Sequence, residues 1–424
     1  MAKLGLFLLP SWLQYESTYR PAPTKNIHTT SYLDGLRGLI SILVFHMDYG
    51  YGYENYDGIL RLPFLRLMYA GPLVPMFFIV SGFVLSLKTF KLAQVAAHES
   101  LFLSLSKSIF RRAIRLFSPP IITTFFVMVL AQLGRFSFPY SDIPGRKPVH
   151  PVAESSFWLQ FLHWTNFVTD ELVNPWRWDV PRLEYGPHLW TIPISYKGSL
   201  VVFLLCLLLS RVRPNVRLCI LCGQMAYATM QGRWDMAPFL AGMVLSQLNL
   251  CHSTVMLFQS KNTKNRHLGY VKDMRDFLLL LSGLYIGSFP RHNQVTDCVL
   301  GYRFLCSITP NYRYWHDIAA FNIIWALSRQ KHLQVPLSSA TAQYFGKISF
   351  SMYLIIFGYF TVPFFWKFTG TDSIFHYQLG FGLGMLVTGV VLIWLSDIFK
   401  TAVEDTCESF TAWVEKVCFI TPSI

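Results

Sequence analysis

The sequence predicts an all-α fold, a polytopic membrane helix bundle with about ten transmembrane helices. Three observations lead to this fold class. Hydrophobic residues make up 53% of the 424 residues and charged residues only 14%, and the mean hydropathy is +0.37. Apolar segments long enough to cross a bilayer recur along the whole chain. A protein of this composition cannot hide its apolar side chains in a water-soluble core.

A window of about 20 residues, enough for one helical crossing of a bilayer, selects the apolar segments. They cover residues 33–50, 70–88, 113–134, 188–210, 216–232, 234–250, 276–290, 315–328, 345–368 and 377–399. No internal repeat, heptad array or low-complexity tract separates them. Residues 1–424 are therefore expected to form a single integral-membrane domain.

The loop charges predict how these segments are oriented. Lys and Arg gather in the second, fourth, sixth and eighth connections, whereas the third connection, residues 135–187, mixes bases with acids. Cytosolic loops carry the excess of basic residues, so both termini are expected in the cytosol and residues 135–187 outside it. An endomembrane is the expected location of this multi-pass protein, although the loop charges do not specify the organelle. This alternation also explains the net charge of +13. Nucleic-acid binding is not expected, because it would need the bases on one soluble surface.

The third connection contains an aromatic segment, residues 156–168, with the sequence SFWLQFLHWTNFV. It is too short and too polar to cross a bilayer, so it is expected to form an interfacial helix. Two interpretations remain open. With Trp176 and Trp178 it would form an apolar lid over a pocket for a hydrophobic substrate, or it would belong to an ordinary aromatic belt at the membrane surface.

The eight cysteines give no metal-binding pattern. Cys219 and Cys222 have the spacing C-x-x-C, but they lie in an apolar segment without a second pair or suitably spaced histidines, so packing is the expected role. Cys298 and Cys306 share an expected extracytosolic loop, where they either form a disulfide or stay free. No metal and no bound cofactor are expected.

The first apolar segment, YLDGLRGLISILVFH at residues 32–46, contains an arginine and a histidine. A central arginine costs roughly 2.5 to 3.5 kcal/mol on insertion scales, so such residues usually face a cavity or a partner. Arg37 and His46 are therefore the first catalytic candidates; alternatively, Arg37 reaches the headgroups and only fixes the topology. In an ideal helix their nine-residue spacing puts them on opposite faces, while Asp48 falls near the face of Arg37. A bulge or a kink would be needed to bring Arg37 and His46 together.

Five blocks of sequence resemble one known family, in that family's order. They are YLDGLRG at 32–38, PMFFIVSGFVLS at 75–86, RRAIRLFSP at 111–119, HLWTIPISYKGS at 188–199 and FGKISFSMYL at 345–354. Together they resemble the acyltransferase 3 family of polytopic membrane O-acyltransferases, in particular its fungal branch. The resemblance implies transfer of an acyl group, with acetyl-CoA as the expected donor, to a hydroxyl of a small hydrophobic acceptor. The fungal branch suggests a pathway of specialised metabolism.

Acyl transfer to an alcohol needs a base for the hydroxyl proton and a positive group for the developing oxyanion. His46 suits the base, and Arg37 suits either the oxyanion or the orientation of the donor. Arg111, Arg112 and Arg115 are expected to hold CoA phosphates, with positive-inside anchoring as the alternative. The resemblance adds Trp190, Ser195 and Ser199 as substrate-pocket residues.

Alternatives to this assignment remain. Ser195 stands where the family usually has glutamate, and Ile355 and Ile356 stand where it often has histidine, which leaves a degenerate, non-catalytic member as one possibility. A multi-pass transporter is the rival from another class, although its usual internal symmetry is not seen. His163 and His188 are spare candidates for the base.

Overall fold

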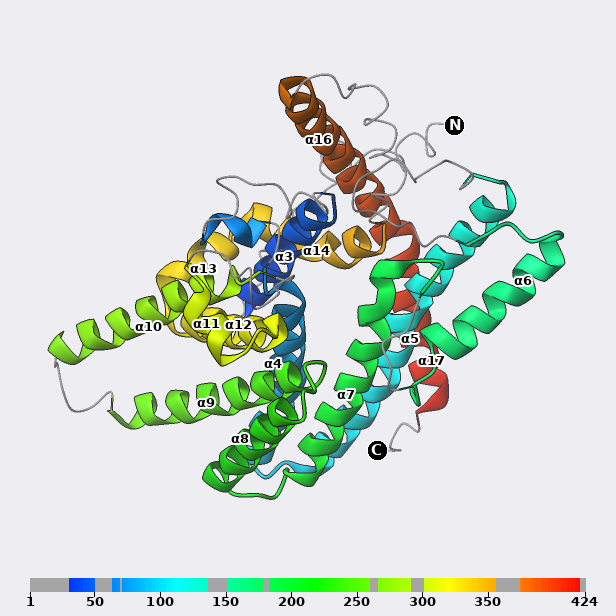
Figure 1. Cartoon of the computed structure of the whole chain (residues 1–424). Coiled ribbons are helices and arrows are strands. Elements are labelled where there is room, and N and C mark those ends of the chain that lie inside the picture. The colour runs from blue at the N-terminus through cyan, green and yellow to red at the C-terminus, as the bar shows by residue number, and fades with distance from the viewer. Residues whose placement is uncertain are drawn as a thin grey trace, which may run out of the picture. The chain divides into compact units, whose positions relative to one another are not determined.

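The computed structural model describes residues 30–49, 63–68, 71–135, 151–177, 183–259, 266–290, 301–355 and 374–419. Within these ranges all regular secondary structure is helical, which confirms the all-α fold class (Figure 1). The contacts group the chain into two compact units. Unit 1 comprises Met1–Tyr53, Phe110–Pro193 and Leu337–Ile424, and unit 2 comprises Glu54–Ile109 and Ile194–Pro336.

Each unit is assembled from helices that are distant in sequence. Unit 1 holds α3 (Ser31–Tyr49), α6 (Phe157–Asn166), η5 (Phe167–Leu172), η6 (Pro187–Trp190), α14 (Ala340–Leu354), α16 (Ile374–Phe399), η8 (Lys400–Glu404) and α17 (Asp405–Cys418). Unit 2 holds η3 (Leu65–Met68), α4 (Leu73–Gln94), α8 (Pro214–Met230), α9 (Ala237–Gln259), α10 (Arg266–Gly287), α11 (Arg303–Ile308), α12 (Tyr312–Arg329) and α13 (Lys331–Leu337). The long helices α5 (His98–Gln132) and α7 (Thr191–Leu208) contribute residues to both units.

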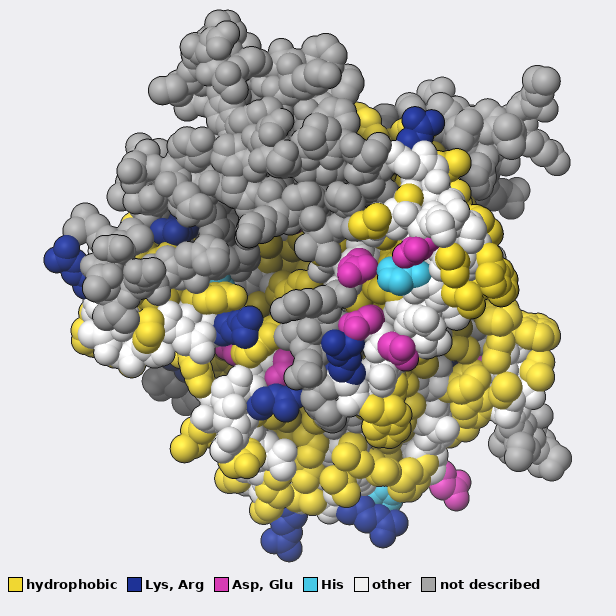
Figure 2. All heavy atoms as spheres, turned by 45° about the vertical axis from the view of Figure 1, so that its right-hand side comes forward, with side chains coloured by type: hydrophobic (Ala, Val, Ile, Leu, Met, Phe, Trp, Pro, Cys, Tyr) yellow, Lys and Arg dark blue, Asp and Glu magenta, His cyan; other side chains and the backbone are white. Residues whose placement is uncertain are grey.

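Four of the described helical segments are long and apolar enough to cross a membrane. They are Leu73–Gln94, His98–Gln132, Pro187–Leu208 and Gly382–Cys418. Hydrophobic side chains are common on the described surface (Figure 2), and Leu204, Leu386 and Val390 on these segments are 55%, 64% and 60% exposed. Apolar side chains that point outward from membrane-length helices are expected to face lipid. The remaining predicted segments also fall on helices where they are described, but the count of about ten crossings stays a prediction.

Unit 1 is organised by a close crossing of α3 and α14, which carry the first and the last of the five sequence blocks. Small residues let two helices approach until their backbones touch. A Cβ added at Gly38 of α3 would lie 2.5 Å from the backbone nitrogen of Gly346 on α14, and one added at Gly346 would collide with the carbonyl of Asp34. Gly82 of α4 has the same function in unit 2, where an added Cβ would collide with the carbonyl of Phe239 on α9.

Replacing Gly38 with alanine is therefore expected to destabilise unit 1 by about 1–3 kcal/mol, the usual cost of overpacking. Gly223→Ala is the matched control, because a Cβ there meets no atom within 4 Å and the substitution gains helix propensity. The thermal unfolding midpoint of the purified protein in detergent measures both changes. Equal midpoints for the two variants would contradict the proposed role of this crossing.

Arg217 is one of the basic residues that the charge pattern assigns to a cytosolic loop, yet it lies inside unit 2. Its side chain is 2% exposed. The guanidinium donates to the carbonyls of Leu209 and Val212 at 3.1 and 3.0 Å and stacks on Phe90 at 4.7 Å. These carbonyls follow the end of α7, where backbone acceptors lack helical partners. Arg217 thus caps α7, in addition to any effect on topology.

The segment predicted to be an interfacial helix is helical in unit 1, as α6, and its place at a membrane interface stays a prediction. Ser156 caps its start by accepting from the backbone nitrogen of Leu159 at 3.3 Å. Its polar residue Gln160 is buried and donates to the Tyr185 hydroxyl at 2.8 Å, whereas Phe157 and Trp158 are exposed. Exposed aromatic side chains on a short helix suit a membrane interface. Trp178 lies outside the described residues, so the lid interpretation stays a prediction.

Cys306 of α11 is disulfide-bonded. Its predicted partner, Cys298, lies outside the described residues. Cys219 and Cys222 on α8 are free thiols.

Candidate active site

The first functional candidates lie on α3, which is one continuous α-helix from Ser31 to Tyr49. No bulge interrupts it, so the ideal geometry applies: nine residues rotate by about 900° and rise about 13.5 Å. Arg37 and His46 consequently lie on opposite sides of α3. Asp48 is eleven residues from Arg37, which corresponds to nearly the same side and a rise of about 16.5 Å. The side of α3 that carries Arg37 therefore also carries Asp48.

Unit 1 places two further arginines close to Arg37. Arg112 and Arg115 of α5 are close enough to Arg37 for their charges to interact, and the charge of Glu404 also acts on Arg37. Arg37 forms an ion pair with Asp34 one turn earlier, at 3.8 Å. Neighbouring positive charges repel one another, and an anion between them relieves the repulsion. The cluster of Arg37, Arg112 and Arg115 is thus suited to bind an anionic group.

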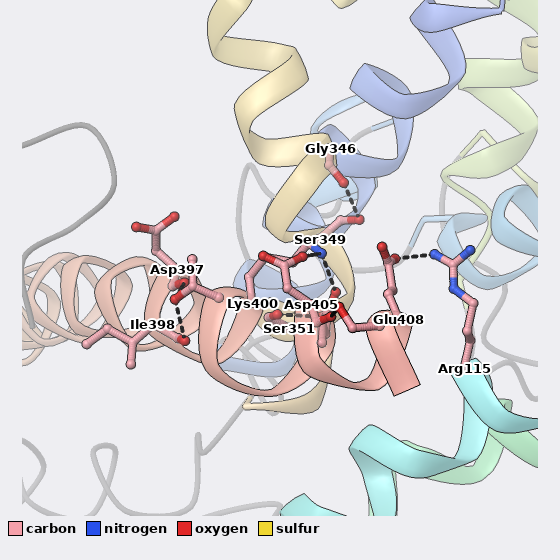
Figure 3. A network of polar contacts seen from close by, with 12 residues as sticks. Arg115, Gly346, Ser349, Ser351, Asp397, Ile398, Lys400, Asp405 and Glu408 are labelled. Carbon is pink, nitrogen blue, oxygen red and sulfur yellow. Dashed lines mark hydrogen bonds and ion pairs between the residues drawn. The ribbon is translucent and has the colours of Figure 1, made fainter. Parts of the chain in front are cut away.

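The two outer arginines of α5 are paired with acidic residues of the C-terminal helix α17. Arg115 bonds Glu408 (Figure 3), and Arg111 bonds Glu415. About half of each arginine side chain remains exposed, 51% for Arg111 and 53% for Arg115. The sequence prediction that these arginines bind phosphates stays a prediction, because the structure also gives them the role of docking α17.

The same polar region continues into η8 and α14 (Figure 3). The ammonium of Lys400 lies 2.6 Å from Asp405 and 3.6 Å from Glu404. The hydroxyl of Ser351 on α14 donates to Glu404. This network fixes the start of α17 next to the sequence block at residues 345–354. The ion pairs with α5 and the polar contacts of η8 and α14 therefore both hold α17 in unit 1.

A second polar cluster lies at the other end of α3, around Asp48. Asp48 is close enough to His188 of η6 and Tyr353 of α14 to interact electrostatically with both. The rings of His188 and Tyr353 pack edge to face with centroids 5.6 Å apart. The Tyr353 hydroxyl donates to the backbone carbonyl of His188 and lies 2.6 Å from the hydroxyl of Thr191. The structure therefore brings three ionisable side chains from three segments together.

His46 is half-buried in the last turn of α3, on the side away from Arg37. His163, the other spare histidine, lies on α6 and is partly exposed. Its Nδ1 is 2.8 Å from the Tyr185 hydroxyl, which in turn accepts from Gln160. Burial raises the pKa of Tyr185, so the phenol stays protonated near neutral pH, and it shares a hydrogen bond with Nδ1 of His163. These hydrogen bonds give His163 a structural role, because they link α6 to Tyr185.

The predicted pocket residues lie around the start of α7. Trp190 ends η6 within unit 1, while Ser195 and Ser199 belong to the part of α7 in unit 2. The buried hydroxyl of Ser199 donates to the carbonyl of Ser195 at 2.5 Å, one turn earlier in the same helix. This bond is common for serine in an apolar helix. The predicted substrate contacts of these three residues remain predictions.

Sequence reasoning missed the acidic residues of α17 and the partners of Asp48. Glu404, Glu408 and Glu415 recur at spacings of four and seven, which puts them on one side of a helix. That pattern is the available signal for a helix that docks on basic residues. In the described ranges, no group of three or more His, Cys, Asp or Glu side chains is arranged to hold a metal ion.

Comparison with known proteins agrees with the five blocks. Residues 30–399 match the family described as an acyltransferase domain. The O-acetyltransferase PaAT-1 of Phomopsis amygdali is 28% identical over 455 residues, which cover 97% of this chain and 88% of that protein. Acyltransferase R4 of a Phoma species and acyltransferase clz18 of Cochliobolus lunatus are each 24% identical and cover 91% of this chain and 95% of their own length. No solved structure matches the chain.

The family match includes every one of the five blocks and residues of both units. The resemblance found in the sequence is thereby confirmed. The chain belongs to the acyltransferase 3 family, and it is an acyltransferase.

Proposed function

We propose that this protein is a multi-pass membrane O-acyltransferase that moves an acyl group, in the first place acetyl, from acyl-CoA to a hydroxyl of a small hydrophobic acceptor. The cluster of Arg37, Arg112 and Arg115 carries the proposal. In a family of acyltransferases, three adjacent cations suit a donor that bears several phosphates. The relative whose printed name is O-acetyltransferase supports acetyl as the group transferred.

In this proposal His46 is the general base. It takes the acceptor's hydroxyl proton while the oxygen attacks the thioester carbon and the C–S bond breaks. Arg37 lies on the opposite side of α3, which favours orientation of the donor over contact with the oxyanion. Arg112 and Arg115 bind CoA phosphates beside Arg37, and Arg111 extends the site. CoA is a co-substrate, and no resident cofactor takes part.

The acceptor enters from the apolar surroundings of the helices, and the family resemblance suggests Trp190, Ser195 and Ser199 as substrate contacts. The fungal relatives and the hydrophobic residues of α6 support a lipid-like or specialised metabolite as acceptor. Both termini then lie in the cytosol of an endomembrane-resident protein, with the arginines near the cytosolic side, where acyl-CoA is available.

Incubation of the purified protein with labelled acetyl-CoA and a panel of hydrophobic alcohols tests the proposal. We expect a labelled ester and release of free CoA in equal amounts. Solute movement across vesicles without ester formation would instead support the transporter. Absence of both, in a folded preparation, would identify a degenerate member in which Ser195 has replaced an essential glutamate.

A further inference from the structure

The C-terminal helix α17 turns a polar side toward the rest of unit 1. Its buried residues are Cys407, Thr411 and Glu415, which recur at spacings of four and therefore share one side of the helix. Glu408 lies on the same side, and Glu408 and Glu415 each bond an arginine of α5. Two carboxylates that a water-facing helix would expose thus point toward α5.

The opposite side of α17 is apolar and exposed. Phe410, Trp413 and Val417 are all more than half exposed. Their spacings of three and four put them on one side of the helix, and the rings of Phe410 and Trp413 stack with centroids 5.9 Å apart. An amphipathic helix in water has the reverse arrangement, with its apolar side on the protein. An outward apolar side of this kind marks a surface that a partner or a membrane covers.

The place of α17 along the chain identifies what covers it. The elements α16, η8 and α17 follow one another without a break from Ile374 to Cys418, and α16 exposes apolar side chains from Leu383 to Leu395. The hydrocarbon core of a bilayer is roughly 30 Å thick. At a rise of about 1.5 Å per residue, the start of α17 lies about 33 Å beyond Leu383. With α16 across the bilayer, α17 therefore begins where the hydrocarbon ends.

The outward residues of α17 suit this level of a membrane. Tryptophan is enriched at the boundary between acyl chains and headgroups, because its ring is apolar and its N–H is polar. Lys416, the basic residue of the last turn, is exposed, and lipid phosphates attract a positive charge at this level. The ion pairs of Glu408 and Glu415 with α5 reduce the repulsion between these carboxylates and the same phosphates.

We propose that α17 is a membrane-interface helix, whose side with Phe410, Trp413 and Val417 lies among lipid headgroups and the upper parts of acyl chains. Lipid then covers the apolar side, while the ion pairs with α5 hold the polar side in unit 1. This inference does not depend on acyl transfer, because it follows from the arrangement of side chains on a helix that continues a membrane-length segment. Its test needs no active preparation.

The test places a fluorescent thiol probe at Trp413→Cys in the full-length protein, reconstituted in nanodiscs of phosphatidylcholine. The free thiols that are not buried are first replaced with serine; they are Cys219, Cys222, Cys251 and Cys418. Two quenchers are compared, a lipid with a nitroxide near the headgroup end of its acyl chain and iodide in the water. We expect the lipid nitroxide to quench the probe strongly and iodide to quench it weakly.

Two positions calibrate the quenching. Leu386→Cys, on the exposed apolar side of α16, is the reference for a position that faces lipid. Asn215→Cys, exposed at the start of α8, is the reference for a position that faces water. The probe on α17 should resemble the first reference.

Quenching by iodide alone would show that the apolar side of α17 faces water, and it would overturn the proposal. Protection from both quenchers would overturn it as well, because protein, such as a second copy of the chain, would then cover this side. If Trp413→Cys lowers the thermal unfolding midpoint, the same comparison at Val417→Cys decides the question, since Val417 lies one turn further along the same side.

Discussion

Replacing His46 with alanine is expected to lower turnover at least about 100-fold, because a positioned general base typically contributes about 100- to 10,000-fold. Folding should change little, since the side chain is only half-buried in the last turn of α3. The measurement is kcat for ester formation, with the thermal unfolding midpoint as a check on folding.

His163→Ala is the matched control for this prediction. His163 shares a hydrogen bond with the Tyr185 hydroxyl and is 43% exposed, so its loss should reduce turnover far less. Near-normal turnover of His46→Ala in an active preparation would reject the base assignment. The pair of Asp48 and His188 would then be the first replacement, because it lies on the Arg37 side of α3.

Local sequence patterns predicted much of the fold. Apolar segments located helices because burial in lipid leaves a continuous signal of about 20 residues. The glycines of the first and last blocks, Gly38 and Gly346, mark one helix crossing because small side chains are needed wherever two backbones touch. The nine-residue spacing of Arg37 and His46 also predicted their opposite sides correctly, since α3 is a regular helix.

The partners of the candidate residues were beyond prediction. Arg111 and Glu415 are 304 residues apart, and nothing in the local sequence of either specifies the other. Asp48 and His188 meet only because η6 and α14 are folded against the end of α3. Arg111, Arg112 and Arg115 fit phosphate binding and membrane topology equally well. A positive charge near a membrane interface can bind an anion, and it can also keep its loop in the cytosol. Tertiary contacts decide such cases.

The ion pairs of α17 are weak enough to be exchanged. The Arg115–Glu408 pair, with side chains 53% and 46% exposed, contributes about 0–1 kcal/mol, whereas a hydrogen bond between charged groups in a bound ligand contributes about 1.5–3 kcal/mol. The Arg111–Glu415 pair is less exposed, because the Glu415 side chain is only 9% exposed. In the proposed function, phosphates of acyl-CoA would displace Glu408 from Arg115 and compete with Glu415 for Arg111.

Two double variants separate phosphate binding from docking of α17. Replacing Arg111 and Arg115 with Gln is expected to raise the KM for acyl-CoA about tenfold or more, as loss of one charge-assisted contact predicts, with the KM for the acceptor unchanged. Replacing Glu408 and Glu415 with Gln breaks the same pairs but leaves the arginines free, so the KM for acyl-CoA should fall. Steady-state kinetics with each substrate varied in turn measures both. If the arginines serve only to dock α17, the two double variants will lower the unfolding midpoint by the same amount, because each removes the same ion pairs. The KM values for acyl-CoA and for the acceptor will then stay unchanged in both variants.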